Sequence, residues 1–160
     1  MSKILIAIDP GAKGAFAVFR RAEITTVPFT GDSDFLESML SIKLDSQRCG
    51  DEVVCWLERV GGYVGSGQPG SAMFKFGDNF GFIRGVVMAL GFELRLVSPQ
   101  TWQKGLPSTP KLADRAAAKR AHKRALKERA AQLYPGRKIT LANADALLIL
   151  DYAFAHTPGF

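Results

Sequence analysis

The chain has 160 residues, of which 47% are hydrophobic and 22% charged, and its formal net charge is +6. This length predicts one domain over residues 1–160, large enough to bury its own hydrophobic core. No run approaches the roughly 18 apolar residues of a membrane-spanning helix, and no secretory h-region precedes Asp9, so we expect a cytoplasmic protein without a membrane partner.

The first third of the chain predicts three short strands, residues 3–9, 15–20 and 23–29, whose tight connections indicate an antiparallel meander. A helix capped by Asp32 or Ser33 is expected next, because apolar residues up to Leu44 recur at intervals of three and four. Residues 52–59 then predict a strand buried on both faces, since their centre is continuously apolar. A strand reached through a helix indicates parallel pairing with an earlier strand.

The rest of the chain alternates between helical and strand patterns. A glycine-rich stretch, residues 61–70, leads into the first of them. The predicted elements are a helix over 71–90, a strand over 92–97, a helical turn over 99–104 and helices over 111–133 and 143–155. Together with the meander they predict an α/β fold, a five-stranded mixed sheet flanked by helices.

Asp9 stands where the first strand ends, after an apolar run and directly before a turn that begins Pro10-Gly11. An ionised carboxylate at the end of a buried strand is costly unless a partner compensates its charge. Glu58 ends the apolar strand 52–59 in the same way. If the two strands are parallel neighbours, both carboxylates emerge at the edge of the sheet where open α/β folds place their ligands.

Asp145 begins the last predicted helix, which is apolar nearly all round and therefore expected to be buried. Taken alone, it is equally well explained as an acidic residue favoured by the helix dipole. Together with Asp9 and Glu58 it makes a cluster of three acids that needs divalent cations to stay ionised, and carboxylate oxygens suit Mg²⁺ or Mn²⁺.

The excess positive charge lies in one segment, residues 111–129, where eight basic residues face two acidic ones. One predicted helix face is small, with Ala117, Ala118, Ala121 and Ala125, and the opposite half carries the cations. A solvated helix face is the alternative, but so few acids are interleaved that an anionic polymer is the better partner. The candidate contacts to such a polymer, which are DNA contacts if the polymer is DNA, are Lys111, Arg115, Lys119, Arg120, Lys123, Arg124 and Lys127.

Three motifs in this order give the chain a resemblance to a known family. They are Ile8-Asp9-Pro10-Gly11 with Gly14, Leu57-Glu58-Arg59-Val60, and Ala144-Asp145-Ala146-Leu147. The chain resembles the RuvC-type Holliday junction resolvases of the RNase H-like superfamily. Residues 71–77, 81–82 and 97–102 also have counterparts in the short phage-encoded branch, so the resemblance covers nearly the whole chain.

This resemblance implies a homodimeric, metal-dependent endonuclease that resolves four-way DNA junctions by paired symmetric nicks. It implies Asp9, Glu58 and Asp145 as catalytic metal ligands for two Mg²⁺ or Mn²⁺ ions per active site. It places the dimer interface on the helix 71–90, although core packing explains that pattern equally well. Such a protein is expected in the cytoplasm of a bacterium or a phage-infected host, associated with the nucleoid when bound to DNA.

Tyr63, in the glycine-rich stretch, is a candidate to stack on an unpaired base at the junction. Alternatively, the glycine-rich stretch is a flexible connector and Tyr63 packs on the rim.

The family usually carries a fourth metal-binding residue one helical turn before the match to Asp145, and here that position is Ala142. Asp151 and Asn143 project from other helix faces. Three explanations stay open: a working three-carboxylate site, a ligand from elsewhere, or a weakened site.

Two other classes share features with this chain. Actin-like ATPases and sugar kinases begin with a similar phosphate-binding turn, but they need a second subdomain for which 160 residues leave no room. A non-catalytic or weakened DNA-binding relative, or a nuclease for other branched DNA or for RNA, remains an alternative.

Overall fold

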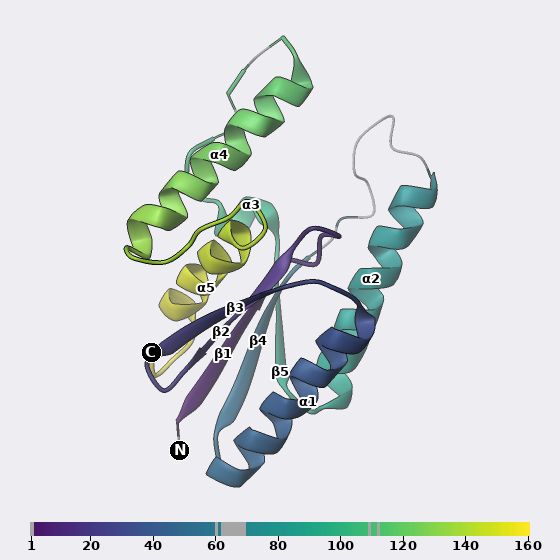
Figure 1. Cartoon of the computed structure of the whole chain (residues 1–160), viewed down its shortest axis with the longest axis vertical. Coiled ribbons are helices and arrows are strands. Elements are labelled where there is room, and N and C mark those ends of the chain that lie inside the picture. Colours follow the sequence, from purple (N-terminus) through teal and green to yellow (C-terminus); the bar gives the residue numbers. More distant parts are fainter. Residues whose placement is uncertain (1, 60, 62–69, 109, 112) are drawn as a thin grey trace.

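The computed structural model of the chain describes residues 2–59, 61, 70–108, 110–111 and 113–160. Its five strands form one sheet with helices on both faces (Figure 1). The strands are β1 (Lys3–Ile8), β2 (Ala15–Arg20), β3 (Glu23–Pro28), β4 (Glu52–Glu58) and β5 (Glu93–Val97). The helices are α1 (Asp32–Cys49), α2 (Gly70–Ala89), α3 (Pro99–Trp102), α4 (Arg115–Leu133) and α5 (Ala144–His156).

The strand order is β3-β2-β1-β4-β5. β1 pairs antiparallel with β2, and β2 with β3, whereas β1–β4 and β4–β5 are parallel. The predicted five-stranded mixed sheet is therefore confirmed. Because Ile8 pairs with Leu57, the next residues, Asp9 and Glu58, leave their strands at the same edge of the sheet.

Alternation along the strands produces two hydrophobic cores, one on each face of the sheet. Ile4, Ile6 and Ile8 of β1 pack with residues of α1 and α2. Leu5 and Ala7 face the other way and pack with α3, α4 and α5. All residues from Ala144 to Leu150 of α5 are buried, as predicted from its apolar sequence.

Several predicted boundaries are corrected by one residue, and those of α1, α3 and α4 by more. α1 runs on to Cys49 and ends at Gly50, whose φ of 67° is a left-handed conformation suited to glycine. Its N-cap is Gly31 rather than Asp32 or Ser33. α4 begins at Arg115, because the Asp114 side chain accepts a hydrogen bond of 2.8 Å from the Ala116 amide and caps the helix. Lys111 thus precedes the helix that was predicted to contain it.

The packing face of α4 also differs from the predicted alanine face. Ala118, Leu126 and Ala130 are its buried residues, at intervals of eight and four, and His122 lies between them in the helical spacing. Ala117, Ala121 and Ala125 are only partly buried. The helix therefore presents Lys119 and Lys123, each next to this face, toward the sheet edge.

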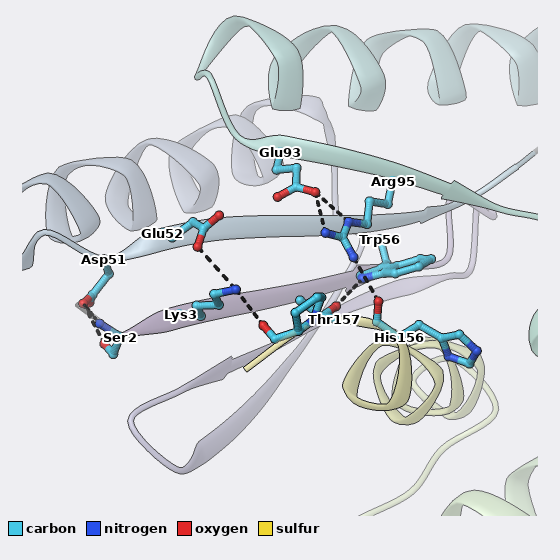
Figure 2. Close-up of polar contacts among 10 residues, drawn as sticks. Ser2, Lys3, Asp51, Glu52, Trp56, Glu93, Arg95, His156 and Thr157 are labelled. Carbon is cyan, nitrogen blue, oxygen red and sulfur yellow. Dashed lines mark hydrogen bonds and ion pairs between the residues drawn. The ribbon is translucent and has the colours of Figure 1, made fainter. Parts of the chain in front are cut away.

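Polar contacts attach the end of α5 and the residues after it to the sheet (Figure 2). The indole of Trp56 donates a hydrogen bond of 3.0 Å to Thr157 Oγ1, and Arg95 donates one of 3.0 Å to the His156 carbonyl. Lys3, the first residue of β1, donates a hydrogen bond of 2.6 Å to the Pro158 carbonyl. None of the helices in the described ranges is long and apolar enough to cross a membrane.

Candidate active site

A tight turn between β1 and β2 presents Asp9. The Gly11 amide donates a hydrogen bond of 3.1 Å to Asp9 Oδ1, and the Gly14 amide closes the turn onto the Gly11 carbonyl at 2.8 Å. A Cβ at position 14 would lie 2.2 Å from the Asp9 carbonyl oxygen, so the turn requires glycine there. The backbone therefore fixes the orientation of the Asp9 carboxylate.

Glu58, the last residue of β4, is held by an aromatic side chain from the neighbouring strand connection. Trp102 donates a hydrogen bond of 2.8 Å from Nε1 to Glu58 Oε2, and its side chain is only 3% exposed. Trp102 ends α3, whose N-cap Ser98 accepts from the Thr101 amide and follows β5 directly. Because β5 is parallel to β4, this turn delivers Trp102 to the edge where Glu58 emerges.

Asp145 enters the site from the first turn of α5 and is 5% exposed. Asn143 does not act beside it as a further acceptor, because its amide nitrogen donates to Thr26 Oγ1 and to the Lys138 carbonyl. Its oxygen accepts from the Thr140 amide at 2.8 Å. Asn143 thus anchors the start of α5, which places Asp145 beneath α4.

The three predicted carboxylates line one open cleft of about 650 Å³. Lys13, Lys119 and Lys123 share it with them, as do Leu141 and Ala142 from the segment before α5. The ammonium group of Lys123 contacts Asp145 Oδ2 as an ion pair. The other oxygen, Asp145 Oδ1, is buried without a hydrogen-bond partner among the described residues.

Burial and mutual repulsion govern the protonation of these acids. Burial, and then the charge of Asp9, raise the pKa of Glu58 to about 7, against the lowering effect of the Trp102 hydrogen bond. Burial and Asp145 raise the pKa of Asp9 above its ordinary value of 3.8. Burial alone would lower the pKa of Lys123, but Asp145, Asp9 and Glu58 raise it overall. Lys123 is therefore a charged ammonium at neutral pH within an acidic cluster.

The donor set suits a hard divalent cation in its chemistry. All three acids offer oxygen, and the unpartnered Asp145 Oδ1 is a buried acceptor in need of a positive partner. The spacing of these acids in the cleft is wider than their chemistry alone suggests. Within the described residues, no three His, Cys, Asp or Glu side chains lie close enough together to share one ion. The cleft therefore offers carboxylate oxygens of suitable chemistry, and Lys123 contacts one of them.

The predicted DNA-contacting cations divide into two groups. Arg115, Lys119, Arg120 and Arg124 of α4 are exposed, as is Lys111 before it, and Lys127 is partly buried. Lys123 is partly buried as well, with its charge on Asp145. Tyr63 lies outside the described residues.

Sequence reasoning gave Trp102 no role in this site and assigned Lys123 to DNA contact rather than to Asp145. In the sequence, Trp102 stands out only as part of the motif over residues 97–102. An aromatic residue in a capped turn directly after a parallel strand is nevertheless expected at the edge of the sheet where Glu58 emerges. Lys123 was counted with the exposed cations. Its position argues against full exposure, because Lys123 comes one residue after His122, which lies on the face that packs α4 against the domain.

The comparisons with known proteins agree with this architecture. No protein-family model matches the chain, and no curated protein matches it in sequence. Among solved structures, RuvC of Thermus thermophilus in complex with Holliday junction substrate superposes with a TM-score of 0.58 at 14% identity, over 97% of each chain. A second T. thermophilus RuvC structure gives a TM-score of 0.53 at 16% identity, over 96% of this chain and 97% of that one. The chain therefore has the RuvC fold over 96–97% of its length.

Proposed function

We propose that this protein is a divalent-metal-dependent endonuclease that resolves four-way DNA junctions by paired symmetric nicks. The observation that carries the proposal is the convergence of Asp9, Glu58 and Asp145 on one cleft, at the edge where β1 and β4 end in parallel. The fold of a RuvC seen with a Holliday junction substrate supports the choice of DNA. The counterparts of residues 71–77 and 97–102 favour the phage-encoded branch, with residues 1–160 as one nuclease domain.

Asp9, Glu58 and Asp145 would hold Mg²⁺ or Mn²⁺, two ions per site once the scissile phosphate is bound. Such ions supply an activated water and stabilise the leaving oxygen of a phosphodiester. The protein's own part is orientation. The Gly11 amide fixes one oxygen of Asp9, and the Trp102 indole fixes one oxygen of Glu58. The remaining carboxylate oxygens are thereby aimed into the cleft before any ligand arrives.

The exposed cations of α4 are proposed to bind the DNA backbone. Lys119 lines the carboxylate cleft, and Arg115, Arg120 and Arg124 continue along the same helix outside it. Neutralising phosphates along such a helix draws a strand across the cleft in a fixed direction. This gives the acids a phosphodiester to act on despite their own negative charge.

A second copy of the chain is proposed to pack against α2. The side of this helix opposite its core residues carries Phe74, which is 75% exposed, and Met88, which is 61% exposed. Between them, at helical spacing, lie Gly77, Gly81 and Gly85, and a Cβ added at any of the three would meet none of the described residues within 4 Å. An apolar strip whose centre is open allows two helix backbones to approach closely, and a dimer would provide the two active sites that paired nicks require.

Cleavage of a synthetic four-way junction tests the proposal. We expect paired nicks in Mg²⁺ or Mn²⁺, none in EDTA, and none with Asp9→Asn, which should fold like the parent. Linear duplex of the same sequence is the control substrate. No nicking of any branched DNA in either metal would exclude the enzyme, and equal cutting of linear duplex would exclude junction specificity.

Position 142 favours one second candidate, a DNA-binding relative with weakened cleavage. Ala142 and Leu141 line the cleft on the side from which a fourth acidic ligand would come. Tight junction binding without nicking would identify this alternative. Nicking of other branched DNA or of RNA, in preference to four-way junctions, would instead change the substrate.

A further inference from the structure

The charges in the carboxylate cleft have an unusual balance. Asp9, Glu58 and Asp145 contribute three negative charges, and the Lys123 ammonium, which contacts Asp145 Oδ2, contributes one positive charge in return. Lys13 and Lys119 also line the cleft, but both are exposed and make no ion pair with these acids among the described residues. When all three acids are ionised, as a bound metal requires, the inner cleft therefore carries a net charge of −2, which one divalent cation neutralises.

The number of carboxylate oxygens left for a cation also indicates one divalent ion. Asp9 Oδ1 accepts from the Gly11 amide, Glu58 Oε2 from the Trp102 indole, and Asp145 Oδ2 from Lys123. Within the described parts of the chain, this leaves one carboxylate oxygen on each acid without a protein donor. Ala142 adds no ligand from the segment before α5. One octahedral ion needs only one or two of these carboxylates together with water, whereas two ions would have to divide the three oxygens between them.

We infer that Lys123 occupies the place of a second divalent cation, so that the DNA-free protein binds one ion per chain and admits another only when Lys123 leaves Asp145. The inference deepens the proposed function and rests on its metal dependence. An ammonium in contact with Asp145 repels any cation that approaches the same carboxylate. A bound phosphate would attract Lys123 away and supply new oxygen ligands, which couples the second ion to substrate binding.

Lys123→Met tests this inference, with Arg124→Met as the matched control. Both changes remove one positive charge from α4, but Arg124 is exposed whereas Lys123 is paired with Asp145. The probe is Mn²⁺ without DNA, its stoichiometry and affinity being measured by isothermal titration calorimetry and by the electron paramagnetic resonance signal of free Mn²⁺. Thermal unfolding with and without Mn²⁺ verifies that each variant is folded.

We expect one Mn²⁺ per chain for the parent protein and for Arg124→Met. Lys123→Met should bind a second ion, or bind the first about tenfold more tightly, because the competing charge is gone. Lys123→Arg, which keeps the charge, should bind one ion and serves as the folded variant should Lys123→Met fail to fold. A Lys123→Arg protein that binds two Mn²⁺ ions would contradict the inference.

Two Mn²⁺ on the DNA-free parent would overturn it, as would identical stoichiometry and affinity in Lys123→Met. Neither result depends on cleavage. A parent that binds two ions and cuts junctions refutes the role of Lys123 and leaves the proposed function intact. A parent that binds one ion, with Lys123→Met binding a second ion or binding the first more tightly as expected, but that cuts no junction refutes the function alone.

Discussion

Trp102 and Glu58 are joined by a hydrogen bond of 2.8 Å between the indole Nε1 and the carboxylate Oε2. The bond crosses from the turn after β5 to the end of β4. It also opposes the burial that raises the pKa of Glu58 to about 7. One buried donor thus both orients this acid and favours its ionised form.

Trp102→Phe should separate these roles, because it keeps the ring in place and removes the donor. We expect the pKa of Glu58 to rise further and junction cleavage to fall about tenfold or more, since a hydrogen bond to a charged group contributes roughly 1.5–3 kcal/mol. Side-chain carboxyl NMR titration of the metal-free protein measures the pKa. An unchanged pKa with normal cleavage would contradict a positioning role, and Trp56→Phe, in the Thr157 contact, is the control.

Glu58→Gln should stabilise the metal-free protein at pH 8. The folded pKa of Glu58, about 7, lies above its ordinary value of 4.5, so the folded state holds the proton more tightly. Its contribution to stability is complete below pH 4.5 and is lost as pH rises to about 7. The loss is on the order of 3 kcal/mol, from about 1.4 kcal/mol per pKa unit.

Urea unfolding in EDTA measures this difference. Parent and Glu58→Gln should have equal stability near pH 4.5 and diverge above it, with the variant unable to cut DNA. Glu37→Gln, an exposed acid of α1, should show no such divergence. A parent whose stability relative to Glu58→Gln does not fall between pH 5 and 8 would disprove the raised pKa.

Gly81→Leu should convert the proposed dimer into a stable monomer. A Cβ at this glycine has no neighbour within 4 Å among the residues that the structure describes, so the new side chain has room on its own protomer. Leucine also favours helix over glycine by about 1 kcal/mol, so folding should not suffer. Multi-angle light scattering gives the mass of each variant. Ala131→Leu, at an exposed position of α4, is the control, and a Gly81→Leu protein that remains dimeric would rule out this interface.

Arg124→Gln should flatten the salt dependence of junction binding. In an Asp9→Asn background, which is expected not to cut, the slope of log affinity against log salt should drop by about 0.9 if Arg124 neutralises one phosphate. Fluorescence anisotropy at several salt concentrations gives the slope. Arg48→Gln, at the end of α1, should leave it unchanged. Equal slopes for the parent and Arg124→Gln would exclude the contact.

The sequence was sufficient to predict where Asp9, Glu58 and Asp145 would meet, because each stands at the end of a strongly patterned element. Parallel pairing of β1 with β4, in which Ile8 lies opposite Leu57, then brings Asp9 and Glu58 together. The side-chain partners were beyond reach for a different reason. Whether Lys123 turns to solvent or to Asp145 depends on the rotation of α4 about its axis, which is set by the packing of Leu126 and Ala130 and not by local composition.

The contacts of Lys3 indicate that both ends of the described chain are suitable points for attaching a tether or a label. Lys3 lies at the start of β1, the end opposite Asp9, and its ammonium donates to the Pro158 carbonyl (Figure 2). Both ends of the described chain therefore leave the molecule on the side away from the cleft. A surface tether or a fluorophore at either end should leave the carboxylates facing solution, which suits the protein to single-molecule observation of junction cleavage.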